Sequence, residues 1–399
     1  MTGRWPVDDG GGRWAQAAAG RGTGPWAGVC CPSTRPSAPS PLPALDVTSP
    51  RHDLPEWQTL ERLIAQGGRW LQVRELGQVA LHERAGGLRR LPLLCLTLGN
   101  PDPACPAVGL FGGVHGLERI GAEVVLGCLH HLVHRLAWDG VLQRQLEQLR
   151  LVMMPLVNPG GLARGTRANP NGVDLMRNAP LQAREPVPFL VGGQRLSAGL
   201  PWYRGPAGAP MELESQAVCR VVEEELLPRP FSLAIDCHSG FGLDDRIWFP
   251  YAHTRAPIEH LPELHALKQL LDSGHLHHTY VFEPQSRQYL AHGDLWDHLY
   301  LQSLQRPDAG VFLPLTLEMG SWRWVKKNPR QLFSRLGLFN PMSQHRHQRV
   351  LRRHLAWLDL MTRAASSHTQ WRPTGAAREQ HRQAALSHWY AGGGGRMGG

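Results

Sequence analysis

The sequence lacks the cysteine pairs and the long apolar runs that define several large protein classes. Its seven cysteines are irregularly spaced and include no Cys-x-x-Cys, so neither a zinc knuckle nor a redox pair is indicated. No apolar run approaches the roughly 18 residues of a membrane-spanning helix, and the first residues show no apolar stretch typical of a signal peptide. We therefore expect a cytoplasmic protein with no membrane partner.

The usual nucleic-acid-binding motifs are also absent, although the chain is basic. Its formal net charge is +9 and its isoelectric point is about 9.6, with arginine more frequent than lysine. A positive net charge of this size can favour binding to nucleic acids, anionic membranes or acidic substrates. Because the positive charges look scattered, we attribute them to general arginine richness and expect no nucleic-acid partner.

Composition divides the chain into two tails and a core. Residues 1–50 are rich in Pro, Gly and Ala, and residues 366–399 are polar and end in glycines. Such segments bury too little apolar surface to offset chain entropy, so both are predicted to be disordered. Residues 51–365 are predicted to form one catalytic domain.

Continuous apolar runs alternate with amphipathic segments in this core. We predict helices over 56–66, 119–136, 210–227, 258–272 and 343–363, and strands over 91–99, 107–115, 149–159, 231–240, 246–251, 279–284 and 311–321. This alternation indicates an α/β fold with a largely parallel sheet covered on both faces. Ligands of such folds bind beyond the carboxyl ends of the strands, where His115, Asn158, His238 and Glu318 each close an apolar run.

Three residues near these strand ends have the chemistry of a zinc site. His115 and Glu118 lie three residues apart at a strand-to-helix junction, and His238 ends a later strand. A catalytic zinc site usually has three protein ligands and one open position. Taken singly, the pair could lie on a solvated helical turn, and His238 could be an ordinary hydrogen-bonded side chain. Their shared placement at strand ends favours the metal site.

Glu318 ends another buried strand, where a carboxylate is costly unless it is paired or functional. One interpretation is an ion pair with a nearby arginine. The other is a general base that takes a proton from metal-activated water and delivers it to the leaving nitrogen.

The loop 157–178 presents three arginines, Arg164, Arg167 and Arg177, with Asp174 among them. It could be a solvated basic loop. Alternatively, one guanidinium could stabilise a developing oxyanion and another could bind a substrate carboxylate, which suits the planar fork of arginine.

In this combination the motifs resemble those of the zinc metallocarboxypeptidases of the carboxypeptidase A type. The resemblance covers roughly residues 90–325, and the matching motifs in chain order are HGLE, NPGG, RANPNGVDLMRN, DCHSG and TLE. It implies a mixed, largely parallel twisted sheet of about eight strands between helices. It also implies one zinc ion bound by His115, Glu118 and His238, with Glu318 as the general base.

The resemblance further implies how a substrate would be held. Arg167 would stabilise the oxyanion, with Arg164 as the alternative for this role, and Arg177 would bind the terminal carboxylate. Asp174 would orient His115 through the ring nitrogen that does not bind metal. The substrate-binding tyrosine of the family would be Tyr289, in YLAHGDLWD, with Tyr300 as the alternative.

Three positions depart from the family pattern. Met176 stands where the family has Asn, Gly160 replaces the Asp of the Asn-Pro-Asp-Gly turn, and Leu117 stands where digestive members carry Arg. The first change removes hydrogen-bond donors from the carboxylate clamp, and a polar site that loses a partner loses discrimination. We therefore expect the substrate to be a modified amino acid, a cell-wall-type peptide or an N-acyl amino acid rather than an ordinary long peptide.

The sequence thus predicts a zinc-dependent hydrolase of an amide bond, with removal of a C-terminal residue as the leading interpretation. The substrate would be a peptide or an acylated amino acid. An N-acyl amino acid deacylase, resembling aspartoacylase and succinylglutamate desuccinylase, is the alternative because that branch shares the ligands and the base. A non-enzymatic alternative is an inactive family member that binds ligand, although no ligand or base is missing from the motifs. The oligomeric state is not predicted.

Overall fold

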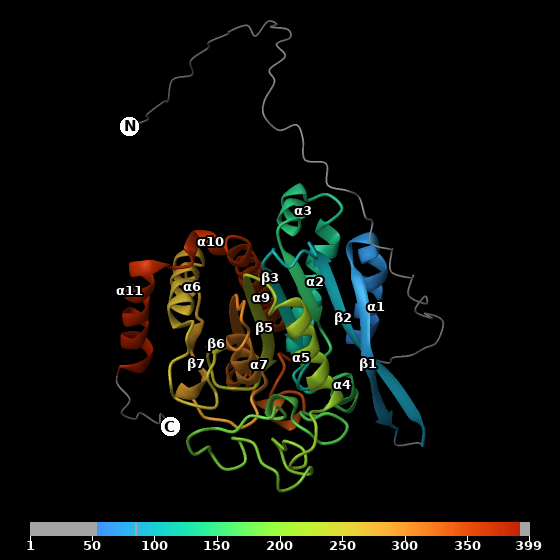
Figure 1. Ribbon diagram of the computed structural model, residues 1–399. Helices are drawn as coiled ribbons and strands as arrows, with labels where there is room; N and C mark the ends of the chain where they lie inside the picture. Colours follow the sequence, from blue (N-terminus) through green and yellow to red (C-terminus); the bar gives the residue numbers. More distant parts are fainter. Residues whose placement is uncertain (1–53, 84–85, 392–399) are drawn as a thin grey trace, which may run out of the picture. The chain divides into compact units, whose positions relative to one another are not determined.

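A mixed sheet of eight strands organises the protein (Figure 1). We describe it from a computed structural model, which describes residues 54–83 and 86–391; the predicted tail 1–50 lies outside them. The strands are β1 (Gln72–His82), β2 (Leu88–Gly99), β3 (Ala107–Gly112), β4 (Arg150–Met154), β5 (Phe231–Ser239), β6 (Arg246–Phe249), β7 (Val281–Pro284) and β8 (Val311–Met319). Their order across the sheet is β1-β2-β4-β3-β5-β8-β6-β7.

The centre of the sheet is parallel and its flanks are mixed. Strands β4, β3, β5 and β8 run parallel to one another, whereas β2 pairs with β4 and β6 pairs with β8 in antiparallel fashion. Every residue of β3, β4 and β5 is buried, because helices cover both faces of the sheet. The predicted α/β fold with a mixed, largely parallel sheet between helices is confirmed.

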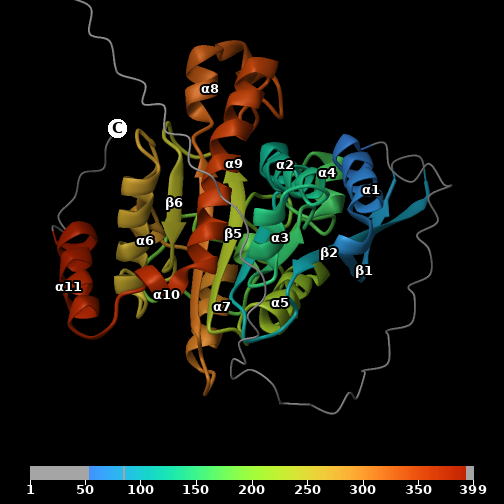
Figure 2. The same ribbon diagram turned by 90° about the horizontal axis from the view of Figure 1, so that it is seen from above.

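The helices form two layers (Figure 2). They are α1 (Pro55–Gly67), α2 (Arg119–Arg135), α3 (Gly140–Leu146), α4 (Pro159–Arg164), α5 (Leu213–Glu225), α6 (Leu261–Gly274), α7 (Leu295–Leu304), α8 (Trp322–Lys327), α9 (Gln344–Ser366), α10 (His368–Trp371) and α11 (Gly375–Ala385). Helices α2 and α9 pack on β3 and β5 at one face, and α1 packs beside α2. Helices α4, α5 and α7 lie on the other face against β1, β2 and β8.

The prediction of a disordered tail from residue 366 onward is wrong for residues 366–391. These residues complete α9, form α10 and α11, and end in a helical turn over Leu386–Tyr390. Helix α11 packs against α6. Trp389 is buried, and its indole nitrogen donates to the carbonyl of Phe282 at 2.8 Å. A few apolar residues at helical spacing anchor this segment, although its average composition is polar.

Two of the absences noted in the sequence can be compared with the structure. Within residues 54–83 and 86–391, no helix is both long and apolar enough to cross a bilayer. The five cysteines in this part of the chain are free, and Cys95, Cys128 and Cys237 are buried, as expected of small core residues. Burial raises the pKa of the Cys95 and Cys128 thiols to about 12, so both are protonated and inert at neutral pH.

Candidate metal centre

A tight turn after β3 carries His115 and Glu118. The turn leaves no room for a side chain at Gly116, where a Cβ would lie 1.9 Å from the carbonyl carbon of Gly161 in α4. Glu118 is the N-cap residue of α2 and lies just before its first turn. The two turns that follow β3 and β4 are therefore packed backbone against backbone directly below the site.

Asn158 holds these two turns together. Its Oδ1 accepts from the amide of Gly161 at 2.7 Å, and its Nδ2 donates to the carbonyl of Val114 at 3.1 Å. A Cβ on Gly160 would lie 2.3 Å from the Cγ of Pro170. The glycine that replaces the family aspartate is thus explained by lack of space. Asn158, one of the polar residues at the predicted strand ends, fixes the backbone beneath His115.

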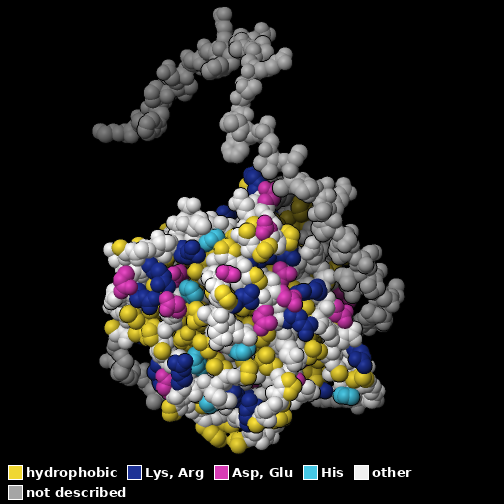
Figure 3. Space-filling view, viewed as in Figure 1, with side chains coloured by type: hydrophobic (Ala, Val, Ile, Leu, Met, Phe, Trp, Pro, Cys, Tyr) yellow, Lys and Arg dark blue, Asp and Glu magenta, His cyan; other side chains and the backbone are white. Residues whose placement is uncertain are grey.

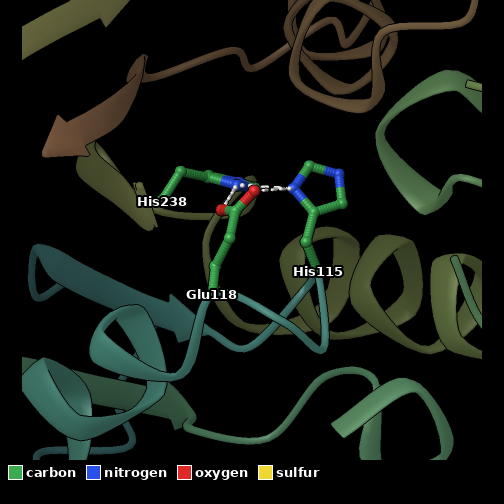
Figure 4. Close-up of side chains that lie close together, drawn as sticks. All are labelled: His115, Glu118 and His238. Carbon is green, nitrogen blue, oxygen red and sulfur yellow. Dashed lines mark hydrogen bonds and ion pairs between the residues drawn. The ribbon is translucent and has the colours of Figure 1, made fainter. Parts of the chain in front are cut away.

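The side chains of His115, Glu118 and His238 converge on one point (Figure 4). The Nδ1 atoms of the two histidines are 3.2 Å apart. The carboxylate of Glu118 lies between them, 2.9 Å from Nδ1 of His115 and 3.0 Å from Nδ1 of His238. Ligand atoms about 2.1 Å from a tetrahedral zinc ion would be about 3.4 Å apart, and the observed spacing is close to this value.

A carboxylate holds the second ring nitrogen of each histidine. Nε2 of His115 is 3.1 Å from Oδ1 of Asp174, and Nε2 of His238 is 2.7 Å from Oδ2 of Asp236. Metal-binding histidines commonly have such partners, which fix the tautomer and turn the other nitrogen toward the ion. The sequence predicted this role for Asp174 but not for Asp236. Its signal was present, because residues 236 and 238 share one face of β5.

The electrostatics of the centre favour a cation. Burial opposes the charged form of Glu118, but the charges and hydrogen bonds of His115 and His238 outweigh it and lower the carboxyl pKa. Burial likewise opposes protonation of His238, yet Asp236 and Glu118 raise its pKa well above the usual value. Three buried carboxylates, those of Glu118, Asp174 and Asp236, thus surround the two imidazoles, and their negative charge favours binding of a cation. The three proposed ligands have the residue types of a zinc site.

Glu318 lies one strand away from His238, in register with it across the parallel β5–β8 pair. It lines the same cavity as the histidines, and its Oε1 accepts from the amide of Phe241 at 3.0 Å. Burial, reinforced by the charge of Glu118, raises the pKa of the Glu318 carboxyl to about 8. Since its hydrogen bond comes from the backbone, the alternative interpretation as an ion-pair partner of an arginine is not supported.

Of the loop arginines, Arg167 lies at the centre and Arg164 does not. Nε of Arg167 donates to Asp174 at 2.8 Å, and one terminal nitrogen donates to Glu118 at 3.2 Å. Burial disfavours its charge, but Asp174 and Glu118 outweigh burial and raise the pKa of Arg167. Arg164 is exposed and donates to the carbonyls of Pro170 and His82.

Arg177 and Tyr289 line another wall of the cavity and contact each other. A terminal nitrogen of Arg177 donates to the Tyr289 hydroxyl at 3.4 Å, and the guanidinium carbon lies 5.7 Å from the centre of the tyrosine ring. Met176 lines the cavity beside them. Tyr300 is fully buried in the core, where its hydroxyl contacts His260, so it does not compete with Tyr289.

The cavity has a volume of about 500 Å³ and is walled largely by aromatic and aliphatic side chains. The sequence did not predict these lining residues, because they come from separate parts of the chain, Trp248 from β6 and the others from turns and loops: Leu117, Val191, Pro201, Trp202, Phe241, Trp248 and Phe339. It also missed Asp294, which lines the cavity and whose Oδ2 has no hydrogen-bond partner among the described residues. Burial, together with the nearby charge of Asp297, raises the pKa of Asp294 to about 7.

Comparisons with known proteins bear on the family and the fold of the chain. The family model for zinc carboxypeptidases matches residues 85–309. Over 77 residues the chain is 36% identical to carboxypeptidase SOL1 of Arabidopsis thaliana, a segment that covers 19% of this chain and only 16% of the plant protein. The crystal structure of thrombin-activatable fibrinolysis inhibitor shares the fold, with a TM-score of 0.56, 18% identity, and coverage of 78% of this chain and 73% of that one.

Proposed function

The chain belongs to the zinc carboxypeptidase family, and we propose that it is an active zinc-dependent hydrolase that removes a C-terminal residue from a peptide or a modified amino acid. The observation that carries this proposal is the convergence of His115, Glu118 and His238 beside Glu318 in one cavity. An inactive binding protein would be expected to have lost a ligand or the base, and this chain retains both.

Zinc, when bound by His115, Glu118 and His238, would activate water and polarise the scissile carbonyl as a Lewis acid. Glu318 would take a proton from the attacking water and deliver it to the leaving nitrogen. Its raised pKa suits the second of these steps, because a protonated carboxyl is the donor that the leaving group needs. The proximity of a bound cation would lower that pKa again and favour the first step.

Arg167 and Arg177, which both line the cavity, would divide the negative charges of the substrate. Arg167, held by Asp174 and Glu118, lies beside the proposed ligands and would stabilise the oxyanion that develops on the carbonyl oxygen. Arg177 lies on another wall with Tyr289 and would bind the terminal carboxylate.

The composition of the cavity supports a substrate other than an ordinary long peptide. Met176 lies beside Arg177 and offers no hydrogen-bond donor to a carboxylate, so the clamp depends on the arginine and Tyr289. The aromatic lining would favour an apolar group on one side of the scissile bond. The same two features keep an N-acyl amino acid deacylase as the second candidate, because an N-acyl amino acid can combine an apolar acyl group with a single carboxylate.

A substrate panel distinguishes the candidates. The purified protein, with zinc and with a chelator, is tested on N-acyl amino acids and on short peptides of matched side chains, with Glu318→Gln as the matched control. Chelator-sensitive release of C-terminal residues from the peptides supports the carboxypeptidase, and faster cleavage of the N-acyl amino acids assigns the deacylase. Cleavage that survives both the chelator and Glu318→Gln contradicts both proposals.

A further inference from the structure

The segment that follows β8 carries a one-sided charge. Residues 319–358 contain no Asp or Glu and nine basic residues, which are Arg323, Lys326, Lys327, Arg330, Arg335, Arg346, Arg349, Arg352 and Arg353. From the sequence we described the positive charges as scattered and expected no membrane partner. That description did not take account of residues 319–358, in which tryptophan and phenylalanine are interspersed among arginine and lysine.

Most of the first basic residues in this run have no ionic partner. Arg323 pairs with Asp244. Lys326, Lys327, Arg330 and Arg335 are exposed and form no ion pair with any described residue. Their charge is therefore available to a partner outside the chain.

The same segment exposes large apolar side chains. The solvent-exposed fractions are 58% for Trp322, 55% for Leu332, 93% for Phe333 and 53% for Met342. We call residues 322–342, which hold these side chains and the four unpaired cations, the basic protrusion. Figure 2 shows its helix α8 projecting beyond the other elements, together with the beginning of α9. Exposed apolar clusters of this kind mark interaction sites.

Hydrogen bonds hold the base of the protrusion against residues that neighbour the candidate metal centre. The side-chain Nε2 of Gln331 donates to the backbone carbonyls of Gly337 and Asn340, and these two hydrogen bonds close the loop. Oδ1 of Asn340 accepts a hydrogen bond at 2.9 Å from the backbone amide of Ile120, at the start of α2. The hydroxyl of Ser239, next to His238, donates to the carbonyl of Phe339 at 2.7 Å. The fold therefore holds Phe333 in solvent on an ordered loop.

We propose that the basic protrusion docks onto an anionic lipid bilayer. Exposed tryptophan, phenylalanine and leucine side chains enter the boundary between headgroups and acyl chains, and adjacent lysines and arginines are attracted to anionic headgroups. A nucleic acid would use the same charges but gains little from the exposed aliphatic side chains of Leu332 and Met342. The combination of exposed aliphatic groups and unpaired cations therefore favours lipid.

The protrusion borders the mouth of the cavity. Phe339 lines the cavity, as does Gly240, whose carbonyl accepts from the indole of Trp322 at 3.1 Å. Across the mouth, the loop that supplies Val191 and Trp202 exposes Phe189 and Leu196, and Figure 3 shows hydrophobic side chains crowded over this loop at the lower end of the view. Docking would thus place the cavity close to the bilayer surface, whatever reaction it supports.

The test is flotation of the full-length protein with lipid vesicles. One set of vesicles is phosphatidylcholine alone, and the other is an equimolar mixture of phosphatidylcholine and phosphatidylglycerol. The charge variant is Lys326→Gln/Lys327→Gln/Arg330→Gln, and the apolar variant is Leu332→Ser/Phe333→Ser. The controls remove the same number of positive charges or large apolar side chains from exposed positions elsewhere and are Arg90→Gln/Arg144→Gln/Arg220→Gln and Trp138→Ser/Leu276→Ser.

We expect the protein to float with the anionic vesicles and not with phosphatidylcholine alone, and raised salt to weaken binding. Each protrusion variant should partition at least about tenfold more weakly, while both controls bind as the original chain does. Absence of flotation with anionic vesicles, or equal flotation of all four variants, would overturn the proposal. Binding of a single-stranded oligonucleotide that only the charge variant loses, without flotation, would instead assign a nucleic-acid surface.

Discussion

His115 and His238 lie 123 residues apart in the chain, yet their Nδ1 atoms are 3.2 Å apart in the structure. Each imidazole is turned toward the other because its far nitrogen contacts a buried carboxylate, Asp174 for His115 and Asp236 for His238. Two such nitrogens beside the carboxylate of Glu118 form a centre whose negative charge a bound cation would balance. The predictions below follow from this arrangement.

Asp236→Asn should weaken zinc binding about 10- to 100-fold while leaving the fold intact, because the amide holds the His238 ring less firmly and lowers its basicity. A competition titration with a chromogenic chelator measures the affinity. Glu263→Gln is the matched control, since Glu263 is also a buried carboxylate but pairs with Arg378 on α11, away from the centre. Unchanged zinc affinity in Asp236→Asn would contradict the proposed role of Asp236.

Substitutions of the two cavity arginines, Arg167 and Arg177, should affect different kinetic constants. Arg167→Lys keeps the charge but loses the planar fork, and we expect kcat to fall about 10²- to 10³-fold with little change in KM. Arg177→Gln should mainly raise KM for substrates with a free carboxylate, because it removes binding that is present before the reaction begins. Steady-state kinetics on one substrate measures both variants, and the opposite pattern would exchange the two proposed roles.

Met176→Asn should restore the missing donors of the carboxylate clamp. We expect kcat/KM on standard C-terminal peptide substrates to rise by about tenfold, which is the value of one hydrogen bond to a charged group. Met176→Leu serves as the control, because it keeps an apolar side chain of similar volume. If the asparagine variant cleaves such peptides no better than the original chain, the account of the thin clamp is wrong.

Glu214 should make stability depend on pH. It is buried at the start of α5, and burial raises its carboxyl pKa to about 7 from a model-peptide value of 4.5. A folded-state pKa above the unfolded value adds stability that is fully present below pH 4.5 and is lost as the pH rises through 7. Glu214→Gln cannot ionise and escapes this loss.

Between pH 5 and pH 8, the free energy of unfolding should therefore fall by about 2 kcal/mol more in the original chain than in Glu214→Gln. Urea denaturation at the two pH values provides the comparison, and every other titrating group cancels between the two proteins. An equal fall in both would show that Glu214 is ionised in the folded state at pH 5.

The sequence was sufficient to predict the sheet and the placement of the proposed zinc ligands. Apolar runs that end in His115, His238 and Glu318 identify parallel strands whose carboxyl ends meet at one edge of the sheet. The topology of the sheet therefore predicts that these three side chains lie close together. The roles assigned to these residues remain predictions. The helices after residue 366 could not be predicted from average composition, because a few contacts such as that of Trp389 with Phe282 hold them.

The residues that line the cavity could not be predicted from the sequence for a different reason. Trp202, Phe241 and Phe339 come from three loops with no periodicity, and only the folded chain brings them together. Asp294 is similar, since an aspartate before a helix is normally an N-cap. Oδ1 of Asp294 does cap α7, but Oδ2 is left without a partner in the wall of the cavity, among the residues that the structure describes.

The most direct test of the account measures zinc content and hydrolysis on the same preparations of the original chain, His238→Ala and Glu318→Gln. We predict one zinc per chain and activity in the original, loss of both in His238→Ala, and full zinc with kcat lowered about 10²- to 10⁴-fold in Glu318→Gln. Zinc bound at full stoichiometry by His238→Ala, or undiminished activity in Glu318→Gln, would contradict it.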